Sequence, residues 1–186
     1  INRHNNQELE RYEIESIEKQ KTQFINCWIK SERESVAMWN LYSNRDSIAL
    51  KANPRKLIDY FQADLSLKPE FYPSYEFICG SITYCRLNPI DVYENVPLPL
   101  YSAFKKDIAY DFEKEFRFLI ATPMTEANTN PENIRIDITS NFINLLEIVC
   151  HPEMEEWKIN NLKRLCKELK FPEPVKSKTE IRIQKI

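Results

Sequence analysis

Three charged residues at alternating positions stand out within residues 110–120, which read Y-D-F-E-K-E-F-R-F-L-I. If a strand begins at residue 115, Glu113, Glu115 and Arg117 share one face, and the phenylalanines between them enter the core. Two neighbouring carboxylates can separate their pKa values and serve as a base and an electrostatic stabiliser. Glu115, Glu113 and Arg117 are therefore the candidate catalytic residues. The structural alternative is that Glu113 is still helical and Arg117 only pairs with a nearby acid.

A second dense stretch, residues 24–51, contains two tryptophans, a methionine and a tyrosine. We interpret it as a strand over 24–29, a helix over 32–42 and a strand over 47–52. Ser31 with Glu34 three residues later is the capping-box pattern, so the helix is expected to begin near residue 32. A functional interpretation makes this stretch one wall of a pocket. Its candidate ligand-binding residues, together with one tyrosine of the other stretch, are Trp28, Glu34, Ser35, Trp39, Tyr42 and Tyr110. The structural alternative is that the tryptophans are core residues and that Glu34 caps its own helix.

Cysteine and histidine usage limits the other kinds of site. The five cysteines are Cys27, Cys79, Cys85, Cys150 and Cys166. Their odd number and the lack of a C-x-x-C pair argue against a disulfide framework, so we expect buried thiols of a cytoplasmic protein. The histidines, His4 and His151, have no ligand spacing, and we expect no metal site. His151 precedes a proline and is interpreted as a turn residue, with an acid–base role as the alternative.

Composition excludes several classes of function. A net charge of −2 argues against nucleic acid as a partner, because nonspecific binding needs an excess of Lys and Arg. No apolar run approaches the roughly 20 residues of a membrane-spanning helix. The single glycine, Gly80, excludes glycine-rich phosphate loops. Hydrophobic and charged contents of 42% and 29% are ordinary for a globular protein.

The remaining patterns predict a single α+β domain over residues 1–186, with a mixed, mostly antiparallel sheet and about five helices packed on it. Helices are expected over 6–21, 54–65, 101–112 and 153–169, the third having the clearest amphipathic spacing. Strands are expected over 77–87, 115–122, 134–138, 145–150 and 175–183, with Gly80 as a bulge or a close approach. The last helix is expected to bury Trp157, Leu162, Leu165, Cys166 and Leu169.

The two dense stretches together resemble the bacterial family known as domain of unknown function 2971. The shared motifs are C-W, E-S-x-A-M-W-x-x-Y and Y-x-x-E-x-E-x-R, matched here by Cys27, Trp28, Glu34, Ser35, Ala37, Met38, Trp39 and Tyr42, then Tyr110, Glu113, Glu115 and Arg117. The chain departs from the family at Ser47, where glycine is usual. It also lacks the family's tyrosine-rich N-terminal segment and N-D-P-type motif, so we expect the natural protein to be longer.

The E-x-E at a strand entrance also resembles ADP-ribosyltransferases at the level of fold. That resemblance implies NAD as cofactor, with Glu115 holding the nicotinamide ribose and Glu113 facing the acceptor, in a defence or toxin effector. It predicts that Glu115 and Arg117 face a ligand-handling cleft also lined by Trp28 or Trp39. Two alternatives remain. One is a non-catalytic sensor or protein-interaction module, and the other is a scaffold whose folding nucleus contains both motifs.

Overall fold

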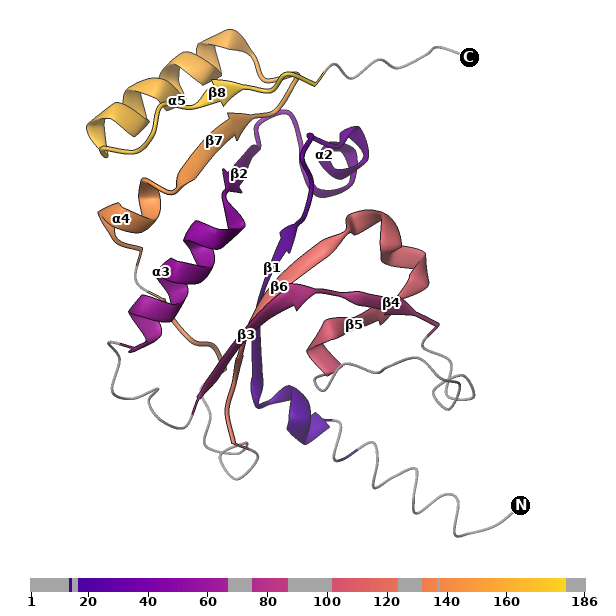
Figure 1. Cartoon of the computed structure of the whole chain (residues 1–186). Helices are drawn as coiled ribbons and strands as arrows, with labels where there is room; N and C mark the ends of the chain where they lie inside the picture. The colour runs from indigo at the N-terminus through magenta and orange to yellow at the C-terminus, as the bar shows by residue number, and fades with distance from the viewer. Residues whose placement is uncertain are drawn as a thin grey trace, which may run out of the picture. The chain divides into compact units, whose positions relative to one another are not determined.

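The structure is a computed structural model, and it describes Ile14 and residues 17–66, 75–86, 102–123, 132–136 and 138–179. Its elements form two compact units (Figure 1). The first contains β1 (Gln23–Ile29), β3 (Glu76–Ser81), β4 (Thr83–Cys85), η2 (Ser102–Phe104), β5 (Lys105–Asp107), η3 (Ile108–Glu113) and β6 (Glu115–Ala121). The second contains α2 (Val36–Tyr42), β2 (Ile48–Ala52), nearly all of α3 (Pro54–Ser66), α4 (Ser140–Ile143), β7 (Leu146–Cys150), α5 (Glu156–Glu168) and β8 (Val175–Lys176).

In the first unit, β6 lies between β1 and β3 and pairs antiparallel with both. Arg117 is opposite Cys27 on β1 and Gly80 on β3, so these three residues lie in one row on one face of the sheet. Leu119, two residues further along that face, is fully buried and packs with Phe104 of η2. The segment around η2 therefore covers the face that carries Arg117.

The opposite face of this sheet is aromatic. Phe118 stacks on Phe77 of β3 with ring centroids 6.1 Å apart, and it meets Phe116 edge-on at 5.4 Å. Trp28 of β1 is the register partner of Phe116 and lies on this aromatic face. Charged residues and phenylalanines alternate along β6, so one face of this strand carries Glu115 and Arg117 and the other face is aromatic.

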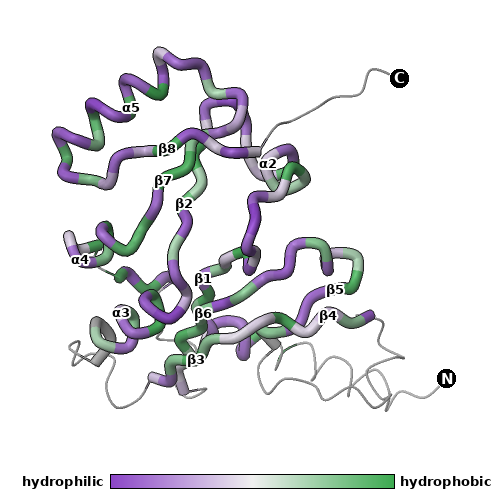
Figure 2. The backbone as a smooth tube through the Cα atoms, turned by 45° about the horizontal axis from the view of Figure 1, so that its top comes forward, coloured by the Kyte–Doolittle hydropathy of each residue, from purple (hydrophilic) through white to green (hydrophobic). Residues whose placement is uncertain are grey.

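In the second unit, β7 lies between β2, which is antiparallel to it, and β8, which is parallel. Helix α5 packs here through Ile159 and Cys166, which are buried, and Ile159 shares a core cluster with Cys150 and Met154. Figure 2 shows hydrophilic and hydrophobic residues alternating along α5, as expected for a helix with one buried face. Among the described strands, β2 and β8 lie at the edges of this sheet.

Helix α3 begins where the sequence predicted. The Oδ1 atom of Asn53 accepts hydrogen bonds from the backbone N–H groups of Arg55 at 3.0 Å and Lys56 at 3.4 Å. This side chain satisfies donors that have no partner within the helix. Leu57 and Phe61 are buried, and the Phe61 ring lies 5.8 Å from that of Phe142 in α4.

The predicted α+β class is confirmed, and three of the five described strand pairings are antiparallel. Within the described residues the strands belong to three sheets, and six helices have defined bounds rather than about five. No described helix has the length and apolar character needed to span a membrane. The described residues cluster into two compact units, and the assignment of residues 1–186 to one domain stays a prediction.

The prediction of an amphipathic helix over residues 101–112 is wrong. Lys105, Lys106 and Asp107 instead form β5, which pairs in parallel with β4. Asp107 then caps the 3-10 helix η3, its Oδ1 accepting from the backbone N–H of Ala109 at 2.9 Å. The apolar residues Ile108 and Phe112 are exposed, so their helical spacing does not mark a buried face. Strand pairing has overridden local propensity here.

Other predicted elements differ in extent or in burial. The strand over 77–87 is interrupted at Ile82, and residues 134–136 and 138 are not in a strand. Gly80 pairs regularly with Arg117, and a Cβ there would lie 3.6 Å from Phe104 Cε1, an ordinary contact. Trp157, Leu165 and Leu169 are exposed rather than buried, because α5 buries the face that carries Ile159. Most of the helix predicted over 6–21 and the end of the strand predicted over 175–183 lie outside the described residues.

Candidate functional site

Four ionisable side chains of the first unit meet in what we call the charge cluster: Lys106, Glu113, Glu115 and Arg117. Lys106 comes from β5, Glu113 ends η3, and the other two lie on one face of β6. Lys114, between the glutamates, has a φ of 47° and closes η3 by donating its backbone N–H to Asp111 O at 3.3 Å. This left-handed residue turns the chain from helix into strand, and both glutamates reach Lys106.

The ion pairs of the charge cluster are largely buried. Lys106 Nζ donates to Glu113 Oε2 and lies 3.4 Å from Glu115 Oε2, while Arg117 Nη2 donates to Glu115 Oε2 at 2.8 Å. Glu113, Glu115 and Arg117 are 3%, 8% and 9% exposed. Two positive and two negative charges therefore balance in a site with little solvent screening.

Backbone and hydroxyl groups fix the position of the charge cluster. Arg117 Nη1 donates to the carbonyl oxygen of Ala103, and the Tyr84 hydroxyl accepts from the backbone N–H of Glu115 at 2.8 Å. Within the described residues, Arg117 Nε is the buried side-chain polar atom that has no hydrogen-bond partner. Such buried polar atoms are rare in folded proteins and call for a physical explanation.

Glu115 is held in its ionised form. Burial alone would raise the pKa of this carboxyl, but hydrogen bonds from Cys27 and Arg117 and the charges of Arg117 and Lys106 outweigh burial and lower it. An acid with a lowered pKa is a poor proton donor and a weak base near neutral pH. It suits the stabilisation of positive charge, which needs a carboxylate already ionised and already oriented.

Cys27 and Tyr110 lie at the border of the charge cluster. Partial desolvation of the thiol, together with the hydrogen bond to Glu115, raises the pKa of Cys27 despite the nearby Arg117 charge, although the residue as a whole is exposed. Cys27 is thus held as a neutral thiol and lacks the properties of a nucleophile. The Tyr110 ring centroid lies 4.8 Å from Lys106 Nζ, a cation–π contact.

The structure brings together Glu113, Glu115, Arg117 and Tyr110 of the predicted site residues. The same arrangement also agrees with both parts of the structural alternative. Glu113 is helical, and Arg117 forms an ion pair with Glu115. Trp28 does not join them, because it lies on the aromatic face and donates its indole N–H to Asn26 Oδ1. Sequence reasoning missed Lys106, because this residue was assigned to a helix instead of to β5.

In the second unit, Glu34 lies at the centre of a separate polar cluster. Its carboxylate accepts hydrogen bonds from Trp39 Nε1 at 3.1 Å, from the Ser177 hydroxyl and from the backbone N–H of Lys178 at 3.3 Å. Burial raises the pKa of Glu34, but the hydrogen bonds from Ser177, Trp39 and Lys178 outweigh it and hold the pKa below its usual value. Glu34 therefore joins the segment before α2 to the segment after β8.

The predicted capping box at Ser31 and Glu34 is wrong, and α2 begins four residues later than predicted. Ser35 is the N-cap, its Oγ accepting from the backbone N–H of Met38 at 3.4 Å. Ser31 accepts instead from Arg33 N at 3.2 Å in a local turn. Because Glu34 is bonded to Ser177 and Trp39, it caps no helix.

Trp39 is a core residue with a polar edge. It is buried, and its ring meets that of His151 at 5.2 Å in an edge-on arrangement. His151 is also buried, and its Nδ1 accepts from the backbone N–H of Glu153 at 3.1 Å, as expected for the turn residue predicted there. Tyr42, by contrast, is well exposed at the end of α2.

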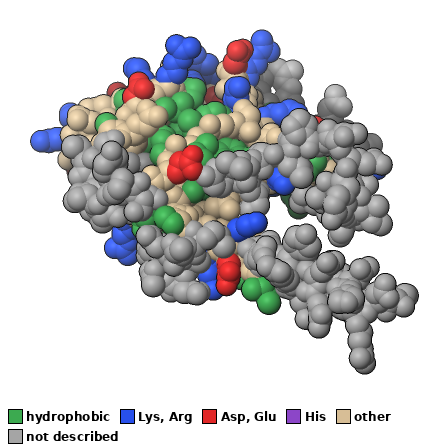
Figure 3. Space-filling model, turned by 60° about the horizontal axis from the view of Figure 1, so that its bottom comes forward, with side chains coloured by type: hydrophobic (Ala, Val, Ile, Leu, Met, Phe, Trp, Pro, Cys, Tyr) green, Lys and Arg blue, Asp and Glu red, His purple; other side chains and the backbone are tan. Residues whose placement is uncertain are grey.

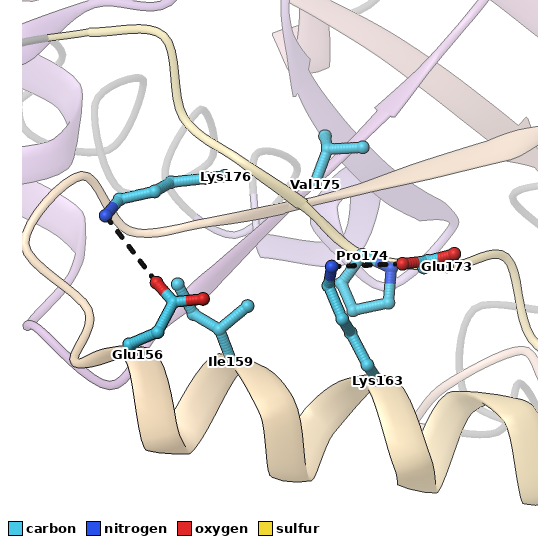
Figure 4. A pocket seen from close by; sticks show the side chains of 7 residues that line it. All are labelled: Glu156, Ile159, Lys163, Glu173, Pro174, Val175 and Lys176. Carbon is cyan, nitrogen blue, oxygen red and sulfur yellow. Dashed lines mark ion pairs between the residues drawn. The ribbon is translucent and has the colours of Figure 1, made fainter.

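The second unit also has a pocket of 380 Å³ between α5 and the segment before and within β8 (Figure 4). Its lining residues are Glu156, Ile159, Lys163, Glu173, Pro174, Val175 and Lys176. The volume falls in the range of about 300–1,000 Å³ typical of small-molecule sites. Its charges, however, form two exposed pairs, Lys163–Glu173 at 3.0 Å and Lys176–Glu156 at 4.0 Å, and exposed pairs of this kind contribute little free energy.

The described residues on the face drawn in Figure 3 do not single out another site. Among the described residues on the face drawn in Figure 3, hydrophobic side chains reach the surface, and lysines and arginines are spread out with acidic residues between them. Searching the described residues for three or more clustered metal-ligating side chains finds none. The five cysteines are free. Cys150 and Cys166 are buried, but Cys79 and Cys85 are only partly buried and Cys27 is exposed, so the expectation of buried thiols is wrong for Cys27.

No family model, curated protein or solved structure matches the chain. The resemblance to the domain of unknown function 2971 family therefore stays a prediction. The residues that suggested it divide between the two units, with Cys27, Trp28 and the Y-x-x-E-x-E-x-R residues in the first and Glu34 to Tyr42 in the second. The predicted cleft shared by both sets of residues likewise stays a prediction.

Proposed function

We propose that the charge cluster handles the cationic part of a small ligand and that the chain is an NAD-consuming enzyme with ADP-ribosyltransferase-like chemistry. The observation that carries this proposal is Glu115, a carboxylate held ionised by Arg117, Lys106 and Cys27 within a largely buried site. Cleavage of the nicotinamide–ribose bond leaves the electron pair on nicotinamide and positive charge on the ribose. A fixed, ionised carboxylate stabilises that charge as it develops.

In this proposal each residue of the charge cluster has a separate role. Glu115 faces the ribose cation, and Arg117 keeps Glu115 ionised and oriented through its bond at 2.8 Å. Glu113 takes the proton of the acceptor whose oxygen or nitrogen forms the new bond to the ribose. Because Lys106 is bonded to Glu113, that proton transfer requires Lys106 to move away first.

We place this enzyme in the cytoplasm, as a defence or toxin effector that consumes NAD without binding nucleic acid. Five free cysteines fit a reducing compartment. The net charge of −2 fits a small-molecule substrate better than a polyanion.

Nicotinamide release from NAD tests the proposal, with Glu115→Gln beside the wild type. The expected result is release by the wild type and a loss of at least about 100-fold in the variant, as for the removal of one electrostatic stabiliser. The matched control is Glu147→Gln, which removes an exposed carboxylate paired with Lys51 and is expected to leave release unchanged. Circular dichroism at the assay temperature must show that both variants are folded. A wild type that releases no nicotinamide and is not stabilised by NAD contradicts the proposal.

The second candidate is a non-catalytic sensor or interaction module. Two observations favour this candidate. Both carboxylates of the charge cluster already have cationic partners within the chain, and Trp28 lies on the other face of the sheet. A module of this kind is expected to gain thermal stability from its ligand without consuming it. Stabilisation by NAD with no nicotinamide release would decide for it.

A further inference from the structure

The ammonium group of Lys106 lies in a cage made of two carboxylates and an aromatic ring. Its Nζ donates to Glu113, lies 3.4 Å from Glu115 Oε2 and lies 4.8 Å from the Tyr110 ring centroid. We call Glu113, Glu115 and Tyr110 the ammonium cage. Carboxylates and an aromatic face are the groups that proteins use to bind an organic cation.

The geometry of the ammonium cage suits a primary ammonium group. An ammonium nitrogen is a compact charge with three donors, whereas a guanidinium is planar and needs parallel acceptors. The side chains of Glu113 and Glu115 are 4% and 10% exposed, but that of Lys106 is 26% exposed. The cage therefore borders solvent through Lys106 and through Tyr110, which is 46% exposed.

The strand that carries Lys106 is weakly held. Strand β5 has three residues and, within the described chain, pairs only with the three residues of β4. A two-stranded pairing of this length is marginally stable in water. Lys106 can therefore withdraw while Arg117 stays bonded to Glu115 on the central strand β6.

Arg117 leaves one donor of the charge cluster without a partner among the described residues, and that donor calls for an acceptor rather than for a cation. It is 9% exposed, its Nη2 points at Glu115, and its Nε has no hydrogen-bond partner among the described residues. A buried donor without a partner is costly. A site that rearranges when a ligand enters has a reason to retain such an atom.

We infer that the ammonium cage binds the primary ammonium group of a small ligand and that Lys106 occupies the cage in cis until that ligand displaces it. The inference concerns the same residues as the proposed function, but it depends only on the cage and not on NAD chemistry. It makes Lys106 a regulatory residue, an internal competitor whose removal opens the site.

The test is rescue of Lys106→Ala by ethylammonium chloride, followed as melting temperature against amine concentration. Removal of Lys106 leaves two buried carboxylates with one cation, so the variant is expected to melt below the wild type. Ethylammonium is expected to restore part of that loss, because a ligand that binds only the folded state stabilises it. The same additions are expected to change the wild type far less, since Lys106 already fills the cage.

Two controls make this result specific. Lys51→Ala removes an exposed lysine from its pair with Glu147 and is expected to respond to the amine as the wild type does. Tetramethylammonium chloride at equal ionic strength has no N–H donor and is expected not to rescue Lys106→Ala. Equal responses of Lys106→Ala and Lys51→Ala, or equal rescue by the two salts, would overturn the inference.

If Lys106→Ala does not fold in buffer alone, its refolding yield with and without ethylammonium replaces the melting temperature. A yield that rises only with ethylammonium supports the inference, and an unchanged yield overturns it. The outcome is separable from that of the proposed function. Amine rescue without nicotinamide release keeps the cage and removes the transferase, whereas release without rescue does the reverse.

Discussion

Glu115 combines deep burial with a full negative charge, which a single side chain sustains only when it is surrounded by partners. Here those partners are Arg117, Lys106, the Cys27 thiol and, through its backbone, the Tyr84 hydroxyl. Breaking a buried ion pair is costly because the remaining charge stays buried. The stability of the first unit is thus tied to the ionisation of one carboxyl group.

Because stability depends on the ionisation of Glu115, it is expected to change with pH. Because its pKa in the folded state lies below its usual value of 4.5, Glu115 contributes stability that is fully present above pH 4.5 and is lost as the pH falls through the lower, folded-state pKa. Glu115→Gln is expected to lower the free energy of unfolding by about 3 kcal/mol at pH 7. The difference from the wild type is expected to shrink towards acid pH, measured by urea unfolding between neutral and acid pH. Glu147→Gln, which changes an exposed pair, is expected to differ little at any pH, and a constant gap for Glu115→Gln would contradict this account.

At the scale of elements, α5 ends with a left-handed residue that is not glycine. Lys170 has a φ of 58°, and around it Phe171 N donates to Cys166 O at 2.8 Å and Lys170 N donates to Lys167 O at 3.3 Å. These two bonds form the Schellman motif, in which glycine is the usual residue at the left-handed position. A lysine there carries a steric cost that glycine avoids.

Lys170→Gly is therefore expected to stabilise the protein by about 0.5–1 kcal/mol, measured by urea or thermal unfolding. The gain is limited because glycine also increases the entropy of the unfolded chain. Lys167→Gly, inside the last turn of α5, is the matched control and is expected to destabilise by about 1 kcal/mol. If both substitutions destabilise to the same extent, the left-handed geometry at Lys170 is not the controlling factor.

At the scale of the whole molecule, patterns that depend on burial predicted four of the strands well. Strands β1, β2, β6 and β7 lie within a residue or so of their predicted bounds, because their apolar residues form short, bounded runs. The alternation in β6 also placed Glu115 and Arg117 correctly on one face. These are properties of single strands, which local sequence encodes.

What the sequence could not predict depends on partners far along the chain. The prediction of a helix over 101–112 is wrong because β4 pairs with β5. The prediction of a capping box is wrong because Glu34 is hydrogen-bonded to Ser177, 143 residues away. The prediction that Trp157 is buried is wrong because the amphipathic pattern of α5 is compatible with more than one buried face. Lys106 was missed because its strand, β5, was predicted to be part of a helix. The predicted site therefore contained only one of the two cations of the charge cluster, Arg117.

The pairing of strands makes both units discontinuous in sequence. Strand β1 pairs with β6 across the whole of α2, β2 and α3, and β2 pairs with β7 across the whole of β3 to β6. Any single cut between β4 and η2 therefore separates β1 from β6 and β2 from β7. Each of the two fragments is expected to be largely unfolded alone and to recover helix and sheet content by circular dichroism when mixed, because loop closure between distant strands is what completes each sheet. A fragment that folds unaided would contradict this expectation; otherwise the first sheet cannot close before β6 has been synthesised, nor can β2 find its partner before β7 has been, which delays folding.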